Sequence, residues 1–456
     1  MTNAIAFEQR TWDQLAVGLE LDVESAWVLL ARHVNLDSDS DHTLLVCEAI
    51  AVPDGGYTRR EGDRLTLNPD AWYPAFLRAD AEDLVPIFAH THPRMAPGHS
   101  ELDLELDAEL ARVADARLAR GSYGSLVIGN TREHPEFAAR FAPSAGAWLR
   151  VDRLRIVGER LTLLTHDNAI APGIFNRQVL AFGEVGQRAL KHVRVGVIGA
   201  GGTGSAAIEQ LVRLGVEDIV VIDPQELAET NVTRVYGSDI GMVGTAKVDI
   251  AEAASARIGL NARVAPVHGT LLKRSVAEAL VHCDVILGCT DDHASRLIAT
   301  RLPQAFLQLL IDCGVVIDSR NGALFDILAR VTVVTPTSAC LMCTGDIDPN
   351  QAALEALPSD EQAERIREGY APGLEHTDPS VITYTTMTAS LAVNELLSRL
   401  FGYCEEAPAN KLIARIASRE FSRTRHAPRG AHRCNHGELV GVGLREPFLD
   451  YGWTDE

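Results

Sequence analysis

The segment AHTHPRMAPGHSELD, which contains residues 90–103, brings together side chains that could build a metal centre. His90 and His92 follow an apolar run and are two residues apart. Both side chains would therefore project from the same face of a strand and could bind one metal ion. Asp103 would begin the next helix and could supply a third, oxygen ligand, which leaves a fourth tetrahedral position open for water. This donor set predicts a catalytic zinc site.

The same residues also have a purely structural interpretation. Ser100 and Asp103 have the spacing of a helix capping box, and a histidine pair on a surface is often merely solvated. We expect the neighbouring His99 to be solvent exposed. Four chemically suited residues within one short segment nevertheless favour a metal site over coincidence.

A second group of residues could bind phosphates. The stretch VRVGVIGAGGTGS places Gly199, Gly201, Gly202 and Gly204 between a predicted strand and a predicted helix. Backbone amides and the helix N terminus could receive phosphate oxygens there. Asp223, at the end of the next strand, could accept hydrogen bonds from ribose hydroxyls. These features alone do not separate ATP from NAD.

The polar residues that follow this glycine-rich turn favour a triphosphate. Asn231 and Arg234 lie in ETNVTRV, Lys247 in GTAKVDIA and Asp291 in LGCTDDHASR. Taken singly, such side chains are usually solvated or begin turns. As a set, two cations suit ATP better than NAD.

Cysteines indicate a second, structural metal site. Cys340 and Cys343 form a C-x-x-C pair in ACLMC, and the tail segment AHRCNHG offers His432, Cys434 and His436. We expect Cys434 and His436 to complete a site of three sulfurs and one nitrogen, although the ligands of this second half stay open.

The elements that would position the first site lie between residues 26 and 157. Short apolar runs alternate there with helix-like and turn-rich segments, which indicates an α/β sandwich. The stretch DNAIAPG at residues 167–173 breaks the pattern and marks a domain boundary. The apolar runs are Trp27–Leu30, Leu44–Val46, Leu84–Ala89 and Ser125–Ile128.

Beyond the boundary, strand candidates alternate with helical patterns such as residues 204–214, which is typical of a parallel sheet covered by helices. Residues 345–379 are polar and broken by proline and glycine, and we expect an excursion that carries one helix. The strand candidates are Val193–Ile198, Asp218–Ile222, Arg263–Val267, Val285–Gly288 and Leu309–Asp312.

A length of 456 residues exceeds what one hydrophobic core usually spans. We therefore predict an α/β chain with a metal domain at residues 1–160 and a nucleotide domain at residues 172–426. A tail at residues 427–456 would contribute to the structural zinc site.

Composition excludes several classes of partner. The net charge of −20, from 42 basic and 62 acidic residues, would repel nucleic acids and anionic lipids. The N terminus has no apolar region typical of a signal peptide, and no later stretch reaches the roughly 20 apolar residues that span a bilayer. We expect a cytoplasmic protein whose eight cysteines are reduced. Four of them should pack in cores: Cys47, Cys283, Cys289 and Cys313.

The first motif resembles that of the JAMM/MPN (JAB) metalloproteases, over about the first 155 residues. That resemblance implies zinc-dependent cleavage of peptide or isopeptide bonds after ubiquitin-like proteins. It also implies that Glu24 acts as general base and that Ser100 donates a hydrogen bond to the tetrahedral intermediate. Glu48 is the competing candidate for the base.

With Arg177 in FNRQVLAFGEVGQRAL, the second set resembles the ThiF/MoeB superfamily of activating enzymes. The resemblance implies a Rossmann-like domain that adenylates the C terminus of a ubiquitin-like or sulfur-carrier protein. Arg234 and Lys247 would hold the phosphates, Asp223 the ribose and Asp291 magnesium. Arg177 would be an arginine finger that reaches into the partner subunit, which implies a homodimer.

This second resemblance spans about residues 172 to 400 and departs from the family at one point. Members that form thioesters carry a cysteine in a loop before the last helix, but no cysteine occurs between Cys343 and Cys404. We therefore expect adenylation followed by direct transfer to an external nucleophile.

The leading hypothesis is a bifunctional enzyme that processes a ubiquitin-like protein and activates its C terminus with ATP. The alternatives are an NAD-dependent oxidoreductase with an accessory metal domain and a non-catalytic scaffold that binds a ubiquitin-like tail. The carrier, a possible conjugation or sulfur-transfer partner, and the pathway stay open. Sulfur transfer, metabolite synthesis and conjugation in a bacterial defence system are all compatible with the sequence.

Overall fold

The computed structural model describes residues 2–37, 41–62, 64–144, 147–367, 379–404, 409–430, 432, 434 and 437–453. The chain divides into two compact units. Unit 1 comprises Met1–Gly158, Thr162–Asp167 and Gly441–Gly443. Unit 2 comprises Glu159–Leu161, Asn168–Val440 and Leu444–Glu456. The tail that begins at residue 427 is thus shared between the units.

Unit 1 is built on a mixed sheet with a small separate hairpin. The strands are β1 (Asn3–Glu8), β2 (Ala26–Val34), β3 (His42–Ala51), β4 (Tyr57–Arg60), β5 (Leu65–Leu67), β6 (Val85–Pro93), β7 (Tyr123–Asn130), β8 (Pro135–Ala142), β9 (Leu149–Arg150), β10 (Arg153–Val157) and β11 (Leu161–Thr165). The large sheet has the order β11-β10-β1-β3-β2-β6-β7-β8-β9, and β4 pairs with β5. The central strand β6 pairs with β2 in antiparallel and with β7 in parallel orientation.

The sheet of unit 1 buries both of its faces. Successive side chains of a strand point to opposite faces, and β2 accordingly sends Leu29 and Ala31 into one core and Val28 and Leu30 into another. Helix α1 (Gln9–Ala16) supplies the first core, whereas α2 (Tyr73–Ala81) and α3 (Glu101–Arg117) supply the second. The α/β sandwich predicted from the apolar runs is therefore present. Strand β1 and helix α1, which precede the first predicted run, were not anticipated.

Unit 2 is built on a second sheet. Its strands are β12 (Arg194–Ile198), β13 (Asp218–Asp223), β14 (Arg263–His268), β15 (Val285–Gly288), β16 (Leu309–Arg320), β17 (Ala323–Val334), β18 (Lys411–Arg415) and β19 (Glu420–Thr424). The order is β14-β13-β12-β15-β16-β17-β18-β19. The first five strands in this order are parallel, and the last three pairings are antiparallel.

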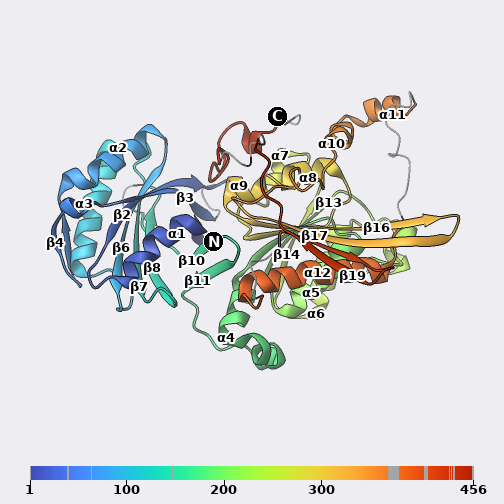
Figure 1. The fold of residues 1–456 in the computed structure, drawn as a ribbon, viewed down its shortest axis with the longest axis horizontal. Coiled ribbons are helices and arrows are strands. Elements are labelled where there is room, and N and C mark those ends of the chain that lie inside the picture. Colours follow the sequence, from blue (N-terminus) through green and yellow to red (C-terminus); the bar gives the residue numbers. More distant parts are fainter. Residues whose placement is uncertain are drawn as a thin grey trace. The chain divides into compact units, whose positions relative to one another are not determined.

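Helices cover both faces of this second sheet. The helices of unit 2 are α4 (Asn176–His192), α5 (Gly202–Leu214), α6 (Lys247–Ile258), α7 (Arg274–Glu278), α8 (His293–Ala299), α9 (Leu302–Phe306), α10 (Pro349–Glu355), α11 (Ser359–Arg367) and α12 (Ile382–Phe401), of which α4 and α11 project away from the sheet. Helices α5, α6 and α12 lie on one face, and α7, α8 and α9 lie on the other (Figure 1). The chain reverses its direction along the sheet after β14, so that β12 and β15 are neighbours in its centre. A doubly wound sheet binds ligands at the carboxyl ends of such strands.

All five strands predicted for unit 2 are present, but two expectations were wrong in extent. Strand β16 continues past Asp312 to Arg320 and forms a long hairpin with β17. The described part of the excursion expected to carry one helix carries two, α10 and α11. Pro358 lies between them, and a proline disfavours helical geometry at the residue before it.

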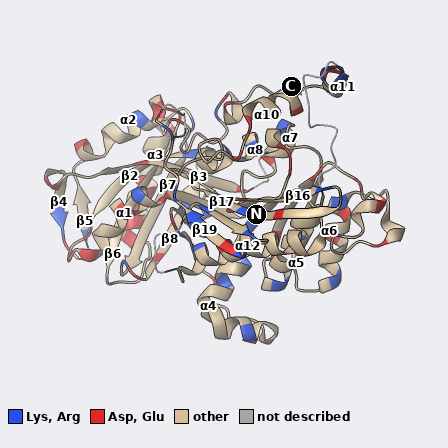
Figure 2. Cartoon of the chain, turned by 45° about the vertical axis from the view of Figure 1, so that its right-hand side comes forward, with Lys and Arg blue, Asp and Glu red and all other residues tan. Residues whose placement is uncertain are grey.

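No helix within the described residues is both long enough and apolar enough to cross a membrane. Lys and Arg residues are scattered over many elements and interleaved with Asp and Glu (Figure 2).

Candidate functional sites

The three predicted metal ligands of the first site come together in unit 1. His90 and His92 lie near the end of β6, and Asp103 lies in the first turn of α3. The Nε2 atoms of the two histidines are 3.1 Å apart, and Nε2 of His90 is 3.3 Å from Oδ1 of Asp103. Nε2 of His92 is 3.9 Å from Oδ2 of Asp103. Ligands of one tetrahedral zinc ion are separated by roughly 3.3–3.6 Å, so this triad has the dimensions of a zinc site.

Electrostatics gives His92 and Asp103 the protonation states that zinc binding requires. Burial, followed by the neighbouring His90, lowers the pKa of His92 to about 4. Its imidazole is therefore neutral at pH 7, with a lone pair available. Burial alone would raise the pKa of Asp103, but hydrogen bonds and charge from His90 and Ser100 hold that pKa well below its ordinary value. A neutral imidazole at His92 and a carboxylate at Asp103 are forms that suit zinc binding.

The capping box that we weighed as the structural alternative is also present. The Asp103 backbone N–H donates to Oγ of Ser100 at 3.2 Å, and the Ser100 N–H donates to Oδ2 of Asp103 at 2.8 Å. The two interpretations are compatible, because the cap uses one carboxylate oxygen and the other faces His90. Since Ser100 Oγ is an acceptor in the cap, its hydroxyl hydrogen can donate to a substrate oxygen.

The geometry separates the two candidate general bases. Oε1 of Glu24 lies 3.6 Å from Nε2 of His92, and the Glu24 side chain is buried. Glu48 instead receives two hydrogen bonds from the Arg78 guanidinium on the surface, at 2.9 and 2.7 Å. Only Glu24 of the two is therefore within reach of a water held by the triad.

A buried polar group, missed in the sequence, fixes α3 behind the triad. Asp107 lies one helical turn after Asp103 and accepts a hydrogen bond from the Tyr123 hydroxyl at 2.8 Å and from Arg140 at 2.6 Å. His99, expected to be exposed, is largely buried, with Nε2 3.0 Å from Ser125 Oγ. The sequence could have pointed to Asp107, because it lies four residues after Asp103 and therefore on the same face of the helix.

A cavity of about 1000 Å³ opens in unit 2 at the carboxyl ends of the parallel strands. Its volume is at the upper end of the range for small-molecule sites. Eight predicted residues line it: Gly199, Gly201, Gly202, Asp223, Asn231, Arg234, Lys247 and Asp291. Gly204 and Arg177 are not among the described residues that line it.

Glycine is required at two positions of the turn for different physical reasons. Gly199 has φ of +92°, which favours glycine, and a Cβ there would lie 2.8 Å from the carbonyl oxygen of Cys289. A Cβ on Gly204 would lie 1.7 Å from the Gly199 carbonyl oxygen, so only glycine allows α5 to pack this closely on the turn. Helix α5 begins at Gly202, and its free N-terminal amides can receive phosphate oxygens in the cavity. Gly204 is therefore needed for packing rather than for nucleotide contact.

Asp223 and Lys247 are both buried at the cavity wall. The Asp223 carboxylate accepts the Ala200 N–H at 2.7 Å and the Gln225 N–H at 2.8 Å, which fixes its orientation beside the glycine turn. Nζ of Lys247 donates to the Gln225 side chain at 2.6 Å. The structure thus holds a cation on one side of the glycine turn and a rigid carboxylate at the end of the adjacent strand.

The loop after β15 explains why Asp291, rather than its neighbour, can serve the cavity. Asp292 caps α8 by accepting the Ser295 N–H, and it also accepts a hydrogen bond from the Thr290 hydroxyl. Asp291 is exposed and lines the cavity. Its carboxylate is available for a cation such as magnesium, for which oxygen ligands are suited.

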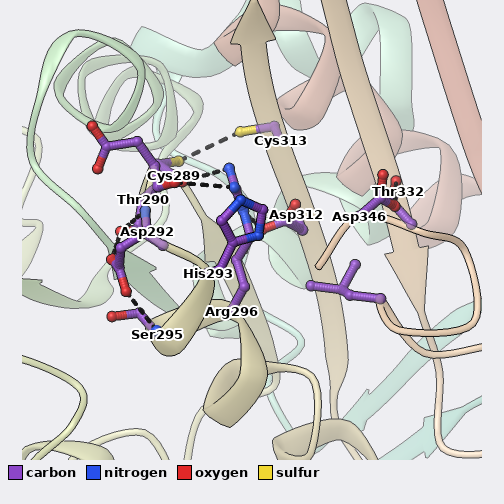
Figure 3. Close-up of polar contacts among 12 residues, drawn as sticks. Cys289, Thr290, Asp292, His293, Ser295, Arg296, Asp312, Cys313, Thr332 and Asp346 are labelled. Atoms are coloured by element: carbon purple, nitrogen blue, oxygen red, sulfur yellow. Dashed lines mark hydrogen bonds and ion pairs between the residues drawn. The ribbon is translucent and has the colours of Figure 1, made fainter. Parts of the chain in front are cut away.

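Arg296, which the sequence analysis missed, holds this loop (Figure 3). Its guanidinium donates to the carbonyl oxygens of Thr290 at 2.7 Å and Asp291 at 3.2 Å, and its Nε is 3.4 Å from Asp312. Arg330 on β17 donates to the other oxygen of Asp312 at 2.6 Å. These contacts join the loop to β16 and β17, and motif spacing could not predict them because they depend on the register in which these neighbouring strands pair.

The second, cysteine-containing cluster also forms among the described residues. Cys340, Cys343, His432 and Cys434 have ligand atoms that all lie within 4.8 Å of one another. His432, one of the two tail histidines considered, is thus in place, whereas the expectation for His436 lies outside the described residues. Burial and the neighbouring Cys343 raise the pKa of Cys434, so a cation would be needed for all three sulfurs to ionise together. Three sulfurs and one nitrogen suit structural zinc.

Two of the four cysteines assigned to core packing are placed differently. Cys283 and Cys313 are buried, as expected, but Cys47 is exposed and Cys289 is only partly buried. Cys289 and Cys313 both line the cavity.

Arg177 lies in the first turn of α4, where it is exposed. The helix is interrupted at Gly183, which has φ of +70°. Leu180 and Val185 on this helix are 88% and 73% exposed, which is unusual for large apolar side chains.

Asp107 provides a test of how α3 is held. Asp107→Asn keeps the shape of the side chain but leaves the Arg140 charge uncompensated. We expect a loss of about 3 kcal/mol, the lower end for breaking a buried ion pair, because Arg140 remains partly exposed. Urea unfolding followed by tryptophan fluorescence reports mainly on unit 1, where four of the five tryptophans lie: Trp12, Trp27, Trp72 and Trp148.

Asp83→Asn is the matched control for this experiment. Asp83 pairs with Arg120, and both side chains are largely exposed, so its loss should cost less than about 1 kcal/mol. Equal effects of the two substitutions would contradict a special role for Asp107.

Comparison with known proteins identifies the second unit. The model of the ThiF family matches residues 175–436, which is more than half of the chain. Molybdopterin-synthase adenylyltransferase of Escherichia coli is 34% identical over 124 residues, which are 27% of this chain and 50% of that protein. The SAMP-activating enzyme E1 of Haloferax volcanii is 28% identical over 161 residues, which are 35% of this chain and 56% of that protein.

The tRNA threonylcarbamoyladenosine dehydratase of Bacillus subtilis is 42% identical over 84 residues, which are 18% of this chain and 33% of that protein. The matched stretch spans about half the length, or less, of these curated relatives. Among solved structures, MccB of Escherichia coli with ATP has a TM-score of 0.46 at 16% identity, over 59% of this chain and 76% of MccB. On the match of its second unit, this chain belongs to the ThiF family.

Proposed function

We propose that unit 2 uses ATP to adenylate the C-terminal carboxylate of a ubiquitin-like or sulfur-carrier protein. The observation that carries this proposal is the cavity that joins the glycine turn to Arg234, Lys247 and Asp291. Support comes from the relatives named as a molybdopterin-synthase adenylyltransferase and a SAMP-activating enzyme. Two cations and an exposed carboxylate fit a magnesium-bound triphosphate better than the single pyrophosphate of NAD, which argues against the oxidoreductase alternative.

The proposed chemistry follows from the charges around the cavity. The carrier carboxylate attacks the α-phosphorus, and the bond to the β-phosphate oxygen breaks, which gives an acyl-adenylate and pyrophosphate. Arg234 and Lys247 stabilise the negative charge that grows on the departing pyrophosphate. Asp223 accepts hydrogen bonds from the ribose and so orients the nucleotide. Magnesium held by Asp291 would supply further charge neutralisation.

We further propose that the adenylate passes directly to an external nucleophile. The sequence lacks a cysteine between Cys343 and Cys404, where thioester-forming members of the superfamily carry one. The nucleophile could belong to a sulfur donor or to a conjugation partner.

For unit 1 we propose zinc-dependent cleavage of a peptide or isopeptide bond that follows the carrier. The specific observation in favour is that the side chains of His90, His92 and Asp103 cluster and that Oε1 of Glu24 lies 3.6 Å from Nε2 of His92. A catalytic centre of this kind argues against a non-catalytic scaffold.

In this second reaction each residue has one task. Zinc would supply a Lewis acid for the scissile carbonyl and would acidify the attacking water. Glu24 takes the proton of that water and passes it to the leaving amine. The Ser100 hydroxyl donates a hydrogen bond to the oxygen of the tetrahedral intermediate. Cleavage by unit 1 would expose the terminus that unit 2 activates.

We propose a homodimer as the adenylating unit. Arg177 is exposed on α4 beside the large apolar side chains of Leu180 and Val185, which a second copy could cover. Arg177 would then reach the cavity of the partner subunit.

Substitution of the cavity residues tests adenylation. Lys247→Ala and Asp291→Ala should each lower ATP–pyrophosphate exchange at least about 100-fold, because each removes a charge that acts on the transition state. Exchange is measured with a small carrier protein that ends in Gly-Gly. Asp249→Asn is the control, because Asp249 lies on the same helix as Lys247 but is exposed and is not among the described cavity residues. Undiminished exchange in both alanine variants would refute the roles assigned.

A second test separates the two candidate bases of unit 1. Glu24→Gln should abolish cleavage of a carrier extended by a peptide, while the zinc content of the protein stays unchanged. Glu48→Gln, whose parent carboxylate is bound by Arg78, should leave cleavage intact. His92→Ala should lose one zinc per chain by elemental analysis. If the Glu24→Gln variant still cleaves the substrate, Glu24 is not the general base.

Mixing two inactive variants tests the homodimer. Arg177→Ala and Lys247→Ala should each be inactive alone, but their mixture should regain about a quarter of wild-type exchange, because half of the dimers contain one intact site of two. Recovery requires that Arg177 acts on the other subunit. If both variants assemble as dimers by sedimentation and the mixture stays inactive, the arginine acts within its own chain or not at all.

A further inference from the structure

Two cysteine thiols face each other inside the cavity of unit 2. Cys289 follows β15 directly, and Cys313 lies in the neighbouring parallel strand β16. Their sulfur atoms are 3.6 Å apart, and both residues line the cavity (Figure 3). Neither belongs to the cysteine cluster that suits structural zinc, and the proposed adenylation uses neither.

The backbone allows these two sulfurs to form a disulfide. The strands pair in parallel, with Gly288 opposite Asp312, so the next residue of each is Cys289 and Cys313. Neighbouring strands lie about 5 Å apart, which falls within the Cα separations that disulfides span. Bond formation needs the sulfurs to approach by about 1.6 Å, to the roughly 2.0 Å of an S–S bond. That approach is of the size that side-chain rotation and a small loop shift provide.

The two partners differ in how freely they can shift. Cys313 is buried in the middle of β16, which pairs with β15 on one side and β17 on the other. Cys289 begins the loop that continues to Asp291. A disulfide would therefore draw the start of this loop toward β16, because the strand is the more rigid partner.

Movement of Cys289 would disturb two parts of the nucleotide site together. Its carbonyl oxygen packs so closely on Gly199 that a Cβ there would lie 2.8 Å away, and its N–H donates to Ile198 at 2.8 Å. Two residues later, the carbonyl oxygen of Asp291 is held by Arg296. A shift of the loop toward β16 therefore changes both the glycine turn and the position of the carboxylate expected to hold magnesium.

We propose that Cys289 and Cys313 form an oxidation site inside the nucleotide cavity, at which a disulfide blocks ATP binding and reduction restores it. This inference rests on the proposed use of the cavity for ATP. The oxidant would be a small molecule able to enter the cavity, such as a peroxide. A bound nucleotide would cover the thiols, so the empty enzyme is the form that reacts.

The chemistry balances with one peroxide for each pair. One thiol, having lost its proton, attacks a peroxide oxygen and becomes a sulfenic acid, and the O–O bond breaks with release of one water. The second thiol attacks the sulfenyl sulfur, the S–O bond breaks, and a second water leaves. The two thiols lose two electrons and two protons, which hydrogen peroxide takes up. A dithiol reductant reverses the reaction by thiol–disulfide exchange.

The test uses the full chain, reduced and then treated with hydrogen peroxide with or without magnesium and ATP. Peptide mass spectrometry should find a Cys289–Cys313 cross-link in the nucleotide-free sample and at least about 10-fold less of it in the ATP-protected sample. Equilibrium titration should show that ATP affinity falls at least about 10-fold on oxidation and recovers with dithiothreitol, since a displaced loop misplaces contacts to the nucleotide.

Three variants make the outcome decisive. Cys313→Ala and Cys313→Ser should bind ATP in the reduced state and keep that affinity after peroxide, because no cross-link can form. Cys404→Ser removes an exposed cysteine that does not line the described cavity, and its response should match that of the wild type. Absence of the cross-link in the nucleotide-free wild type, or a cross-link without loss of ATP affinity, would overturn the proposal. So would an equal loss of affinity in the Cys313 variants.

The same experiment distinguishes this inference from the function on which it rests. If the reduced wild type does not bind ATP, the proposed adenylation fails, whatever the cysteines do. If it binds ATP and peroxide leaves the affinity intact, adenylation stands and only the oxidation site is wrong.

Discussion

The close approach of α5 to the glycine turn is the constraint on which the nucleotide cavity depends. A Cβ on Gly204 would lie 1.7 Å from the carbonyl oxygen of Gly199, so any side chain there would force the helix away from β12. With the helix in place, its free amides point into the cavity beside Asp223, which accepts the Ala200 N–H. The carboxyl ends of β12, β13 and β15 meet at this edge, which is why residues far apart in sequence gather there.

In the proposed metal site of unit 1, a single residue has two structural roles. One aspartate, Asp103, caps α3 with one oxygen and faces His90 with the other. A turn later, Asp107 anchors the same helix to Tyr123 and Arg140. The residue that caps the helix can thus also serve as the proposed metal ligand, so the structural and functional interpretations of this motif are compatible. Burial favours the neutral form of His92 and the local bonds favour the ionised form of Asp103, which readies both for a cation.

Local patterns in the sequence predicted much of this arrangement. Apolar runs located the central strands of both sheets, and motif spacing predicted that Lys247 and Asp291 share one cavity and that His90 and His92 share one cluster. Contacts that depend on the register of paired strands could not be predicted in this way. Arg296 and Arg330 meet at Asp312 only because β15, β16 and β17 are neighbours. In the tail, His432 lies with the three cysteines, whereas His436 lies outside the described residues, so the expectation for it stays a prediction.

The central claim is that the cavity of unit 2 is shaped for a triphosphate with magnesium and not for a dinucleotide. Calorimetric titration of the reduced full chain with magnesium–ATP and, separately, with NAD tests it most directly. The account predicts saturable binding of ATP that weakens when magnesium is removed, with NAD bound at least about 100-fold more weakly, a difference near 2.7 kcal/mol. Tight NAD binding without measurable affinity for ATP would contradict it.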